Sequence, residues 1–208
     1  MDMNAAEHGI STCQGSDALV IGVTGHRTVD PGDHRVNRAI RRELYQLACA
    51  RGRGALVLCS LAQGADQMVA SAALEICRAR LIVPLPAQLP AYRSDFTSPP
   101  ARFGFEHLFA RASAMVAAPD LGNASREGGY AWAGAWIAAR ADVLVAVWDG
   151  GPARGEGGTA DVVRWFLSLE VPQVFQGFGP GARRRRGAAR LLVHVDPAKG
   201  SARRLTAG

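Results

Sequence analysis

The chain has 208 residues, of which 48% are hydrophobic and 20% are charged, a composition that excludes disordered and fibrous proteins. No apolar run approaches the roughly 18 residues that a membrane-spanning helix needs. Residues 1–17 lack the basic start and apolar block of a secretory signal. We therefore expect a cytoplasmic protein with no membrane partner, in which residues 1–17 form a flexible N-terminus.

The net charge of +6 is concentrated at one end of the chain. Residues 179–208 contain eight basic residues and one acidic residue, so the rest of the chain is slightly negative. We interpret 179–208 as a basic C-terminal tail in which Arg183–Arg186 is solvated, with weak contact to nucleic acid as the alternative. The four cysteines show no metal-ligand spacing, so we expect no metal site and no required cofactor.

Short apolar runs alternate with helical patterns from residue 18 onwards. Strands are predicted at 18–24, 55–60, 80–85, 115–118, 142–148 and 173–178, with an edge strand as an option at 190–195. Helices are predicted around 36–47 and over 64–79, 130–141 and 159–170, and 92–113 is expected to be helix-rich with a break at Pro99-Pro100. Apolar strands that alternate with helices are typical of a parallel sheet covered on both faces. The sequence thus predicts an α/β fold, a Rossmann-like doubly wound and mainly parallel sheet, over residues 18–178.

Unusual loops follow four of the predicted strands. They read GHR, SLAQGAD, PLPAQLPAYRSDF and WDGGPARGEGGT. In doubly wound folds the ligand lies at the carboxyl ends of the strands. The four loops are therefore expected to form one binding site.

The glycine-rich loop is the candidate for phosphate binding. Gly157 and Gly158 allow backbone N–H groups to approach a phosphate, and Thr159 begins a helix whose N-terminus is positively polarised. A plain turn with a threonine cap is the alternative. Asp149 and Glu156 flank the loop as candidates for ribose hydroxyls or a purine edge, or as solvated acids.

The other loops supply further candidates for contact with a ligand. In the second loop they are Ser60, Leu61, Ala62, Gly64, Ala65 and Asp66, with simple helix capping as the alternative for the acid. After the first strand, Gly25 and His26 precede Arg27, which we expect to grip phosphate. Tyr92 is a candidate platform for a base and Arg93 a partner for phosphate; a loop anchored by aromatic rings is the alternative.

Three common motifs of nucleotide-binding proteins and metalloproteases are absent from the sequence. It contains no GxGxxG turn, no GxxxxGK[ST] loop and no HExxH. Classical dehydrogenases, P-loop enzymes and zinc proteases are therefore excluded.

The motifs IGVTGHR, CSLAQGADQMVA, VPLP…YRSDF, IAARADVLVAVWDG and GEGGTADVV resemble the SLOG superfamily over residues 18–178. That superfamily includes the Lonely-guy enzymes, the DNA-processing protein A fold and small bacterial proteins linked to defence or stress. The resemblance implies a nucleotide or an NAD-derived ligand such as ADP-ribose, and a homo-oligomer with the helix over 130–141 as one possible surface. It also implies that Gly157, Gly158 and Thr159 match the phosphate loop, and Ser60, Gly64 and Asp66 the second loop.

The chain departs from the Lonely-guy pattern PGGxGTxxE, in which the glutamate is catalytic. The matching position here is Val162, and Asp161 comes one residue earlier. We therefore expect a nucleotide-binding module that senses its ligand. One alternative is an N-glycosidic hydrolase, of the Lonely-guy or the NAD-glycohydrolase type, in which Asp161, Glu156 or Asp149 stabilises a ribosyl centre. The other is a nucleic-acid-associated protein that acts through the arginine-rich tail.

Overall fold

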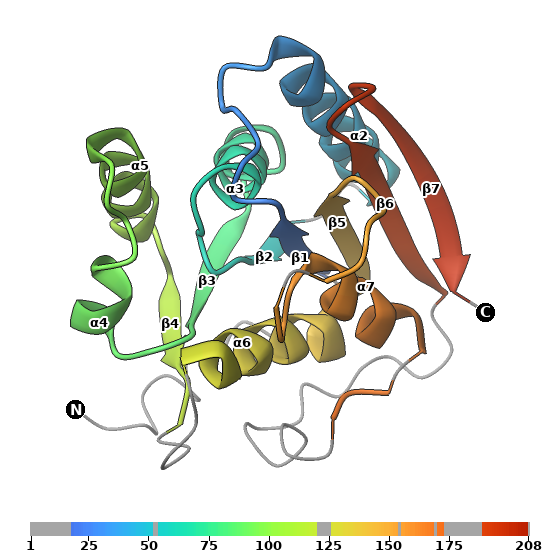
Figure 1. Cartoon of the computed structure of the whole chain (residues 1–208). Helices are drawn as coiled ribbons and strands as arrows, with labels where there is room; N and C mark the ends of the chain where they lie inside the picture. The colour runs from blue at the N-terminus through green and yellow to red at the C-terminus, as the bar shows by residue number, and fades with distance from the viewer. Residues whose placement is uncertain are drawn as a thin grey trace.

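The structure is a computed structural model that describes residues 18–51, 54–119, 126–153, 155–168, 170–172 and 189–207 (Figure 1). Its strands are β1 (Leu19–Gly25), β2 (Ala55–Leu58), β3 (Arg80–Leu85), β4 (Ala114–Ala117), β5 (Val143–Val147), β6 (Arg190–Asp196) and β7 (Ser201–Ala207). Its helices are α2 (His34–Arg51), α3 (Ala65–Ile76), α4 (Leu89–Arg93), α5 (Pro99–Phe109), α6 (Arg126–Arg140) and α7 (Thr159–Ser168). The predicted strands and helices that fall on described residues are present, with small shifts at their ends.

The strands form one sheet in the order β4-β3-β2-β1-β5-β6-β7. All neighbouring pairs are parallel except β6 and β7, which are antiparallel. Helices α2, α3 and α5 lie on one face, and α6 and α7 lie on the other (Figure 1). The predicted Rossmann-like, doubly wound α/β fold is therefore confirmed.

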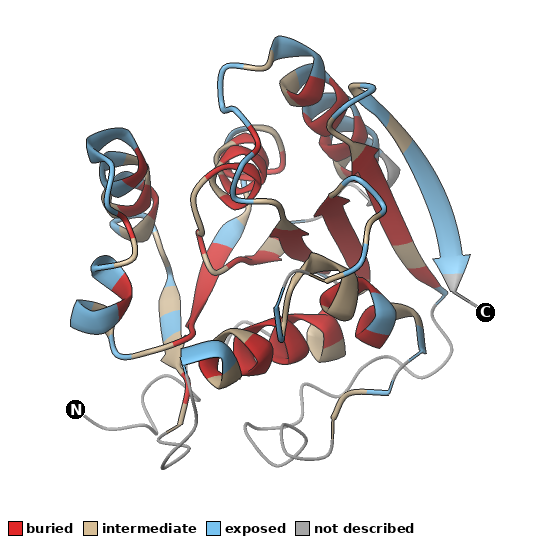
Figure 2. Ribbon diagram, viewed as in Figure 1, coloured by how far each residue is buried: buried red, intermediate tan, exposed pale blue. Residues whose placement is uncertain are grey.

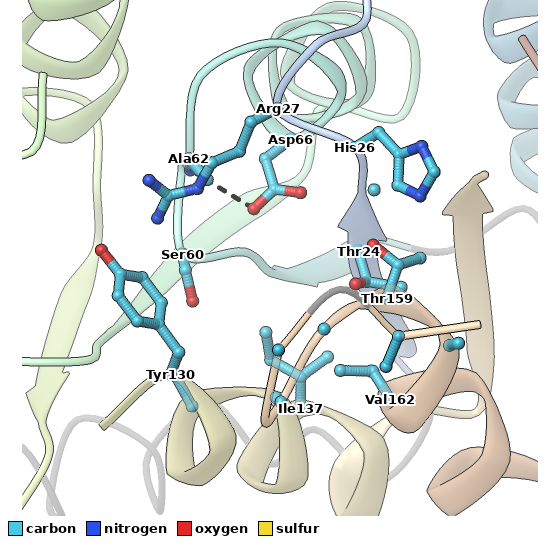
Figure 3. Close-up of a pocket in the computed structure, with 18 of the residues that line it drawn as sticks. Thr24, His26, Arg27, Ser60, Ala62, Asp66, Tyr130, Ile137, Thr159 and Val162 are labelled. Atoms are coloured by element: carbon cyan, nitrogen blue, oxygen red, sulfur yellow. Dashed lines mark hydrogen bonds between the residues drawn. The ribbon is translucent and has the colours of Figure 1, made fainter. Parts of the chain in front are cut away.

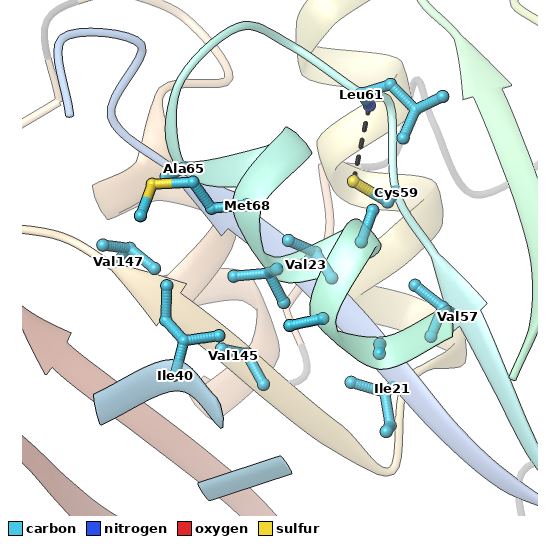
Figure 4. Packing of buried hydrophobic residues seen from close by; sticks show 14 of the residues in the cluster. Ile21, Val23, Ile40, Val57, Cys59, Leu61, Ala65, Met68, Val145 and Val147 are labelled. Atoms are coloured by element: carbon cyan, nitrogen blue, oxygen red, sulfur yellow. Dashed lines mark hydrogen bonds between the residues drawn. The ribbon is translucent and has the colours of Figure 1, made fainter. Parts of the chain in front are cut away.

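Apolar residues on both faces of the sheet fill two cores (Figure 2). On one face, Val23 of β1 and Met68 of α3 belong to the core shown in Figure 4. On the other face α6 packs so closely on β1 that a Cβ added at Gly22 would lie 2.7 Å from Ile137. Glycine at this position lets α6 approach the sheet and form one wall of the site described below.

Helix α6 was expected to offer a surface for a second copy of the chain. In the structure residues 131–138 of this helix are all buried. Trp132 and Trp136 are only 2% and 4% exposed and belong to the core shared with α7. This helix therefore presents no apolar face to solvent at those positions.

The prediction of an edge strand at 190–195 is wrong in its position. Strand β6 pairs with β5 on one side and with β7 on the other, so it lies inside the sheet. The edge is β7, which sequence analysis missed because its polar sequence SARRLTA has no apolar run. The strand predicted at 173–178 lies outside the described residues.

The break predicted at Pro99-Pro100 is instead the start of α5. The hydroxyl of Ser98 accepts a hydrogen bond from the Ala101 N–H at 3.4 Å, and the prolines occupy the first turn. Proline is favoured there because the first N–H groups of a helix need no intrahelical acceptor.

Part of the expected basic tail belongs to the sheet. The buried guanidinium of Arg190 donates a hydrogen bond to the Phe166 carbonyl, which ties β6 to α7. Arg204 of β7 pairs with the buried Glu43 of α2 at 2.8 Å and donates to Gln46 at 2.7 Å. The option of a strand at 190–195 is therefore correct, and residues 201–207, which were expected in the tail, also belong to the sheet. Arg183–Arg186 and residues 1–17 lie outside the described residues.

No helix in the described parts of the chain is long and apolar enough to cross a membrane.

Two truncations should separate the contributions of β6 and β7 to stability. A chain that ends after Ala189 loses both strands, exposes β5 and should show no cooperative unfolding. A chain that ends after Lys199 loses only β7 and the partner that Arg204 gives to Glu43, so its Tm should fall by roughly 10 °C. Thermal unfolding followed by circular dichroism measures both, and a full-length Tm for the shorter chain would contradict the strand assignment.

Candidate functional site

A cavity of about 420 Å³ opens at the carboxyl end of β1 (Figure 3). Its walls come from the β1–α2 loop, the β2–α3 loop, α6 and the loop that leads into α7. The strand order reverses at β1, which has β2 on one side and β5 on the other. Ligands of doubly wound folds bind in the crevice at such a reversal.

The structure brings most of the predicted site residues to this cavity. Those that line it are Gly25, His26, Arg27, Ser60, Ala62, Asp66, Tyr92, Glu156, Gly157, Gly158 and Thr159. Those absent from its lining are Leu61, Gly64, Ala65, Arg93, Asp149 and Asp161. The predicted convergence of loops is present, but several individual roles differ.

The β2–α3 loop is shaped by backbone packing. Gly64 has φ +81°, and a Cβ there would lie 2.7 Å from the Arg27 carbonyl oxygen. The Ala65 N–H donates to the His26 carbonyl at 3.3 Å, and the His26 N–H donates to the Val147 carbonyl at 3.0 Å. Gly64 and Ala65 therefore hold the β1–α2 loop in place, where sequence analysis expected them to contact a ligand.

Leu61 also serves the core. Its side chain is fully buried, and its N–H donates to the Cys59 sulfur at 3.4 Å (Figure 4). Its φ of +61° is uncommon for a residue with a branched side chain. The strained backbone turns the chain from the sheet towards the cavity, although the Leu61 side chain takes no part in it.

The glycine-rich loop uses two of its N–H groups internally. The Gly157 N–H donates to the Asp161 carboxylate at 3.2 Å, and the Gly158 N–H donates to the Gly155 carbonyl at 3.1 Å. Asp161 also pairs with Arg164 at 2.7 Å. These two N–H groups are therefore already hydrogen-bonded within the protein. Thr159, which lines the cavity, marks the N-terminus of α7, where the helix dipole gives a partial positive charge.

Arg27 lies at the cavity with its guanidinium over an aromatic ring. Its Cζ is 4.8 Å from the centre of the Tyr130 ring, a cation–π distance. The Tyr130 hydroxyl donates to Asp95, which also pairs with Arg126 of α6. Tyr130 was not predicted as a site residue, because in the sequence an aromatic residue of an apolar helix cannot be distinguished from a core residue.

Tyr92 has a different role from the predicted base platform. It is 1% exposed, and its ring makes edge contacts with Phe96 at 5.2 Å and Phe105 at 5.6 Å. Its hydroxyl donates to the Ser60 carbonyl at 2.9 Å. The residue anchors the β2–α3 loop, which is the alternative that sequence analysis left open.

Arg93 lies outside the cavity lining. Its guanidinium makes two hydrogen bonds to Glu106, at 2.8 and 2.9 Å, on the exposed surface of α5. The prediction that Arg93 contacts phosphate is not supported by this geometry, since the side chain is committed to a neighbouring carboxylate.

Asp66 is the buried acid of the cavity. It is 6% exposed, and one carboxylate oxygen accepts a hydrogen bond from the Ala62 N–H at 3.3 Å (Figure 3). Burial raises the pKa of Asp66 to about 7, and the nearby Arg27 opposes this rise. Burial also raises the pKa of the Cys59 thiol beneath it.

The other acids are more exposed than Asp66, and Asp149 lies outside the cavity lining. Asp149 is 3.8 Å from the His26 ring, and its side chain is 40% exposed. Glu156 is exposed in the glycine-rich loop, and Glu127 of α6 is a further exposed acid in the lining, which sequence analysis missed. The side of the cavity opposite Arg27 includes apolar residues of α6 and α7, among them Ile137 and Val162.

A comparison with solved structures finds two proteins that this chain resembles in fold. DNA processing protein A (DprA) from Streptococcus pneumoniae is 15% identical over 62% of this chain and 41% of its own, with a TM-score of 0.45. The Moco carrier protein of Chlamydomonas rheinhardtii is 17% identical over 74% of this chain and 72% of its own, with a TM-score of 0.36. No family model and no curated protein matches the chain. Because the chain spans less than half of DprA, the ligand has to be inferred from the chain's own residues.

Substitutions at two glycines should test whether loop packing builds the site. Gly64 and Gly150 both have a positive φ, but an added Cβ at Gly150 meets nothing within 4 Å. Gly150→Ala should lower the free energy of unfolding by about 1 kcal/mol through backbone strain alone. Gly64→Ala adds a clash with backbone and should cost about 2–4 kcal/mol. Urea unfolding measures both, and equal losses would show that the contact with Arg27 is unimportant.

Proposed function

We propose that the chain is a nucleotide-binding protein that senses a nucleoside phosphate or an NAD-derived ligand such as ADP-ribose. The observation that carries the proposal is the cavity at the strand-order reversal, where Arg27 and the N-terminus of α7 both face the same space. A cationic side chain and a helix N-terminus each favour an anionic group. The SLOG resemblance adds a role in bacterial defence or stress to the proposal.

The cavity has the size and the two-sided character that a nucleotide requires. Its volume of about 420 Å³ falls within the range of about 300–1,000 Å³ that is common for ligand pockets. Thr159 and Arg27 give one part of the lining a phosphate-binding character. Ile137 and Val162 give another part an apolar surface against which a base can pack.

Binding without hydrolysis is favoured by the positions of the acids. Val162, at the position where the Lonely-guy pattern has its catalytic glutamate, is a buried apolar residue of the cavity wall. Asp161 is engaged with Gly157 and Arg164. Of the remaining candidates for an N-glycosidic hydrolase, Glu156 is an exposed acid in the cavity lining, and Asp149 is an exposed acid outside it.

Two measurements on the purified protein test the proposed function. Calorimetric titration with AMP, ADP-ribose and NAD should give saturable binding of at least one of them. Chromatography of the same mixtures should then show intact nucleotide, whereas release of free base would establish the hydrolase alternative. No binding of any of these compounds would contradict the proposal.

Arg27 should contribute a charge-assisted contact to the phosphate. Such contacts typically contribute about 1.5–3 kcal/mol, so Arg27→Ala should weaken AMP binding by roughly tenfold or more and adenosine binding much less. Arg93→Ala is the matched control, because Arg93 pairs with Glu106 and lies outside the cavity lining. Calorimetry with both ligands measures the effect, and equal weakening of AMP and adenosine would assign Arg27 to loop structure.

A further inference from the structure

The environment of Asp66 is costly for a carboxylate. Its side chain is almost fully buried, yet it lines the cavity. One oxygen accepts a hydrogen bond from Ala62, and Figure 3 shows the second oxygen turned away from that residue. The Cys59 thiol, a weak donor, is a further hydrogen-bond partner of this carboxylate. Burying a carboxylate without its full set of partners is unfavourable.

Helix capping does not account for this burial. Asp161 occupies the first turn of α7 as Asp66 occupies that of α3, and there both carboxylate oxygens have partners. The side chain of Asp161 also keeps 19% of its surface exposed. Asp161 thus shows that an acid in the first turn of a helix of this chain can find its partners without being buried. Helix capping alone does not require the burial of Asp66, so its placement points to a ligand.

The charged and titratable groups around Asp66 set its ionisation. Arg27 comes from the β1–α2 loop, Cys59 directly follows β2, and Tyr92 comes from α4. Arg27 favours the carboxylate, but burial outweighs it, and the pKa of Asp66 rises to about 7. The carboxyl is therefore partly protonated at neutral pH, and a ligand that donates hydrogen bonds to it would favour the charged form.

We propose that Asp66 selects the ligand by accepting hydrogen bonds from the 2′- and 3′-hydroxyls of a ribose. This assignment rests on the proposed function and narrows it to ribonucleoside phosphates over their deoxy counterparts. Asp66 lies near Arg27 and Ser60, away from the apolar residues proposed for the base (Figure 3). The sugar joins base to phosphate, so it is the part of a nucleotide that meets this polar region. A carboxylate is a common acceptor for ribose hydroxyls in nucleotide-binding folds.

The preference for ribose should depend on pH in a defined direction. Hydroxyl donors stabilise the carboxylate, so the ratio of AMP affinity to 2′-deoxy-AMP affinity should increase as pH rises through about 7. A ratio between two monophosphates removes the shared titration of their phosphate groups. If instead an anionic group of the ligand lay next to Asp66, binding would weaken at high pH, and the effect would not depend on the ribose hydroxyls.

The experiment is calorimetric titration with AMP, 2′-deoxy-AMP and 3′-deoxy-AMP at pH 6 and pH 8. Wild-type protein at pH 8 should bind AMP roughly tenfold to a hundredfold more tightly than either deoxy compound, the range of a hydrogen bond to a charged group. Asp66→Asn keeps an acceptor for Ala62 and removes the charge, so it should still bind nucleotide while losing most of this discrimination and its pH dependence.

Asp142→Asn is the matched control. Asp142 also accepts one backbone hydrogen bond, from the Val20 N–H at 3.0 Å, but it precedes β5 and lies at the opposite end of the strands. This variant should keep the wild-type discrimination. Equal affinity of wild-type protein for AMP and both deoxy compounds would overturn the assignment even if Asp66→Asn failed to fold. Failure to bind any of the three, or the NAD-derived ligands tested above, would instead overturn the proposed function itself.

Discussion

The site depends on the close packing of three backbone segments at the carboxyl ends of β1, β2 and β5. The His26 N–H bonds the Val147 carbonyl, and the Ala65 N–H bonds the His26 carbonyl. Glycine is required where these segments touch, because a Cβ at Gly25 would lie 2.4 Å from the Ala65 Cβ and one at Gly64 would meet the Arg27 backbone. This backbone contact holds Arg27 and Asp66 beside the same cavity, although the two residues come from different segments of the chain. Rigid backbone placement of this kind reduces the ordering cost of binding.

Sequence patterns predicted strands β1 to β5, the main helices and the edge of the sheet on which the site lies, but not strand β7. Apolar strands between amphipathic helices permit few arrangements, and parallel strands end at the same edge of the sheet. The individual roles were harder to predict, because a side chain's direction depends on tertiary partners. Arg93 and Tyr92 are adjacent in the sequence, yet Arg93 pairs with Glu106 on the surface and Tyr92 packs inside an aromatic cluster. Nothing in the local sequence distinguishes these outcomes from contact with a ligand.

The C-terminal residues illustrate the limit of charge arithmetic. The composition of an arginine cluster favours a solvated tail. Composition does not reveal which carboxylates and carbonyls lie beside the arginines in the folded chain. Arg190 and Arg204 bond Phe166 and Glu43, residues distant in sequence that only the assembled fold brings close. Edge strand β7 escaped detection for a related reason: an exposed edge carries polar and charged side chains that oppose pairing with other chains. The arginines of β7 therefore belong to the fold, and their number says little about a partner.

The cavity combines features that serve the fold with one that does not. Gly157 lets its loop pack on α6, Tyr92 anchors a turn, and Asp161 accepts a hydrogen bond from the Gly157 N–H before α7. Each would be explained in a protein that binds nothing. Asp66 differs, because its burial raises its pKa to about 7 while the unfolded chain ionises near 3.8, so the folded state binds more protons than the unfolded one between these values. Stability consequently falls as pH rises through that window. A residue that weakens the fold at neutral pH, and lines a cavity formed by three loops and α6, is better explained by what the cavity binds than by how the chain folds.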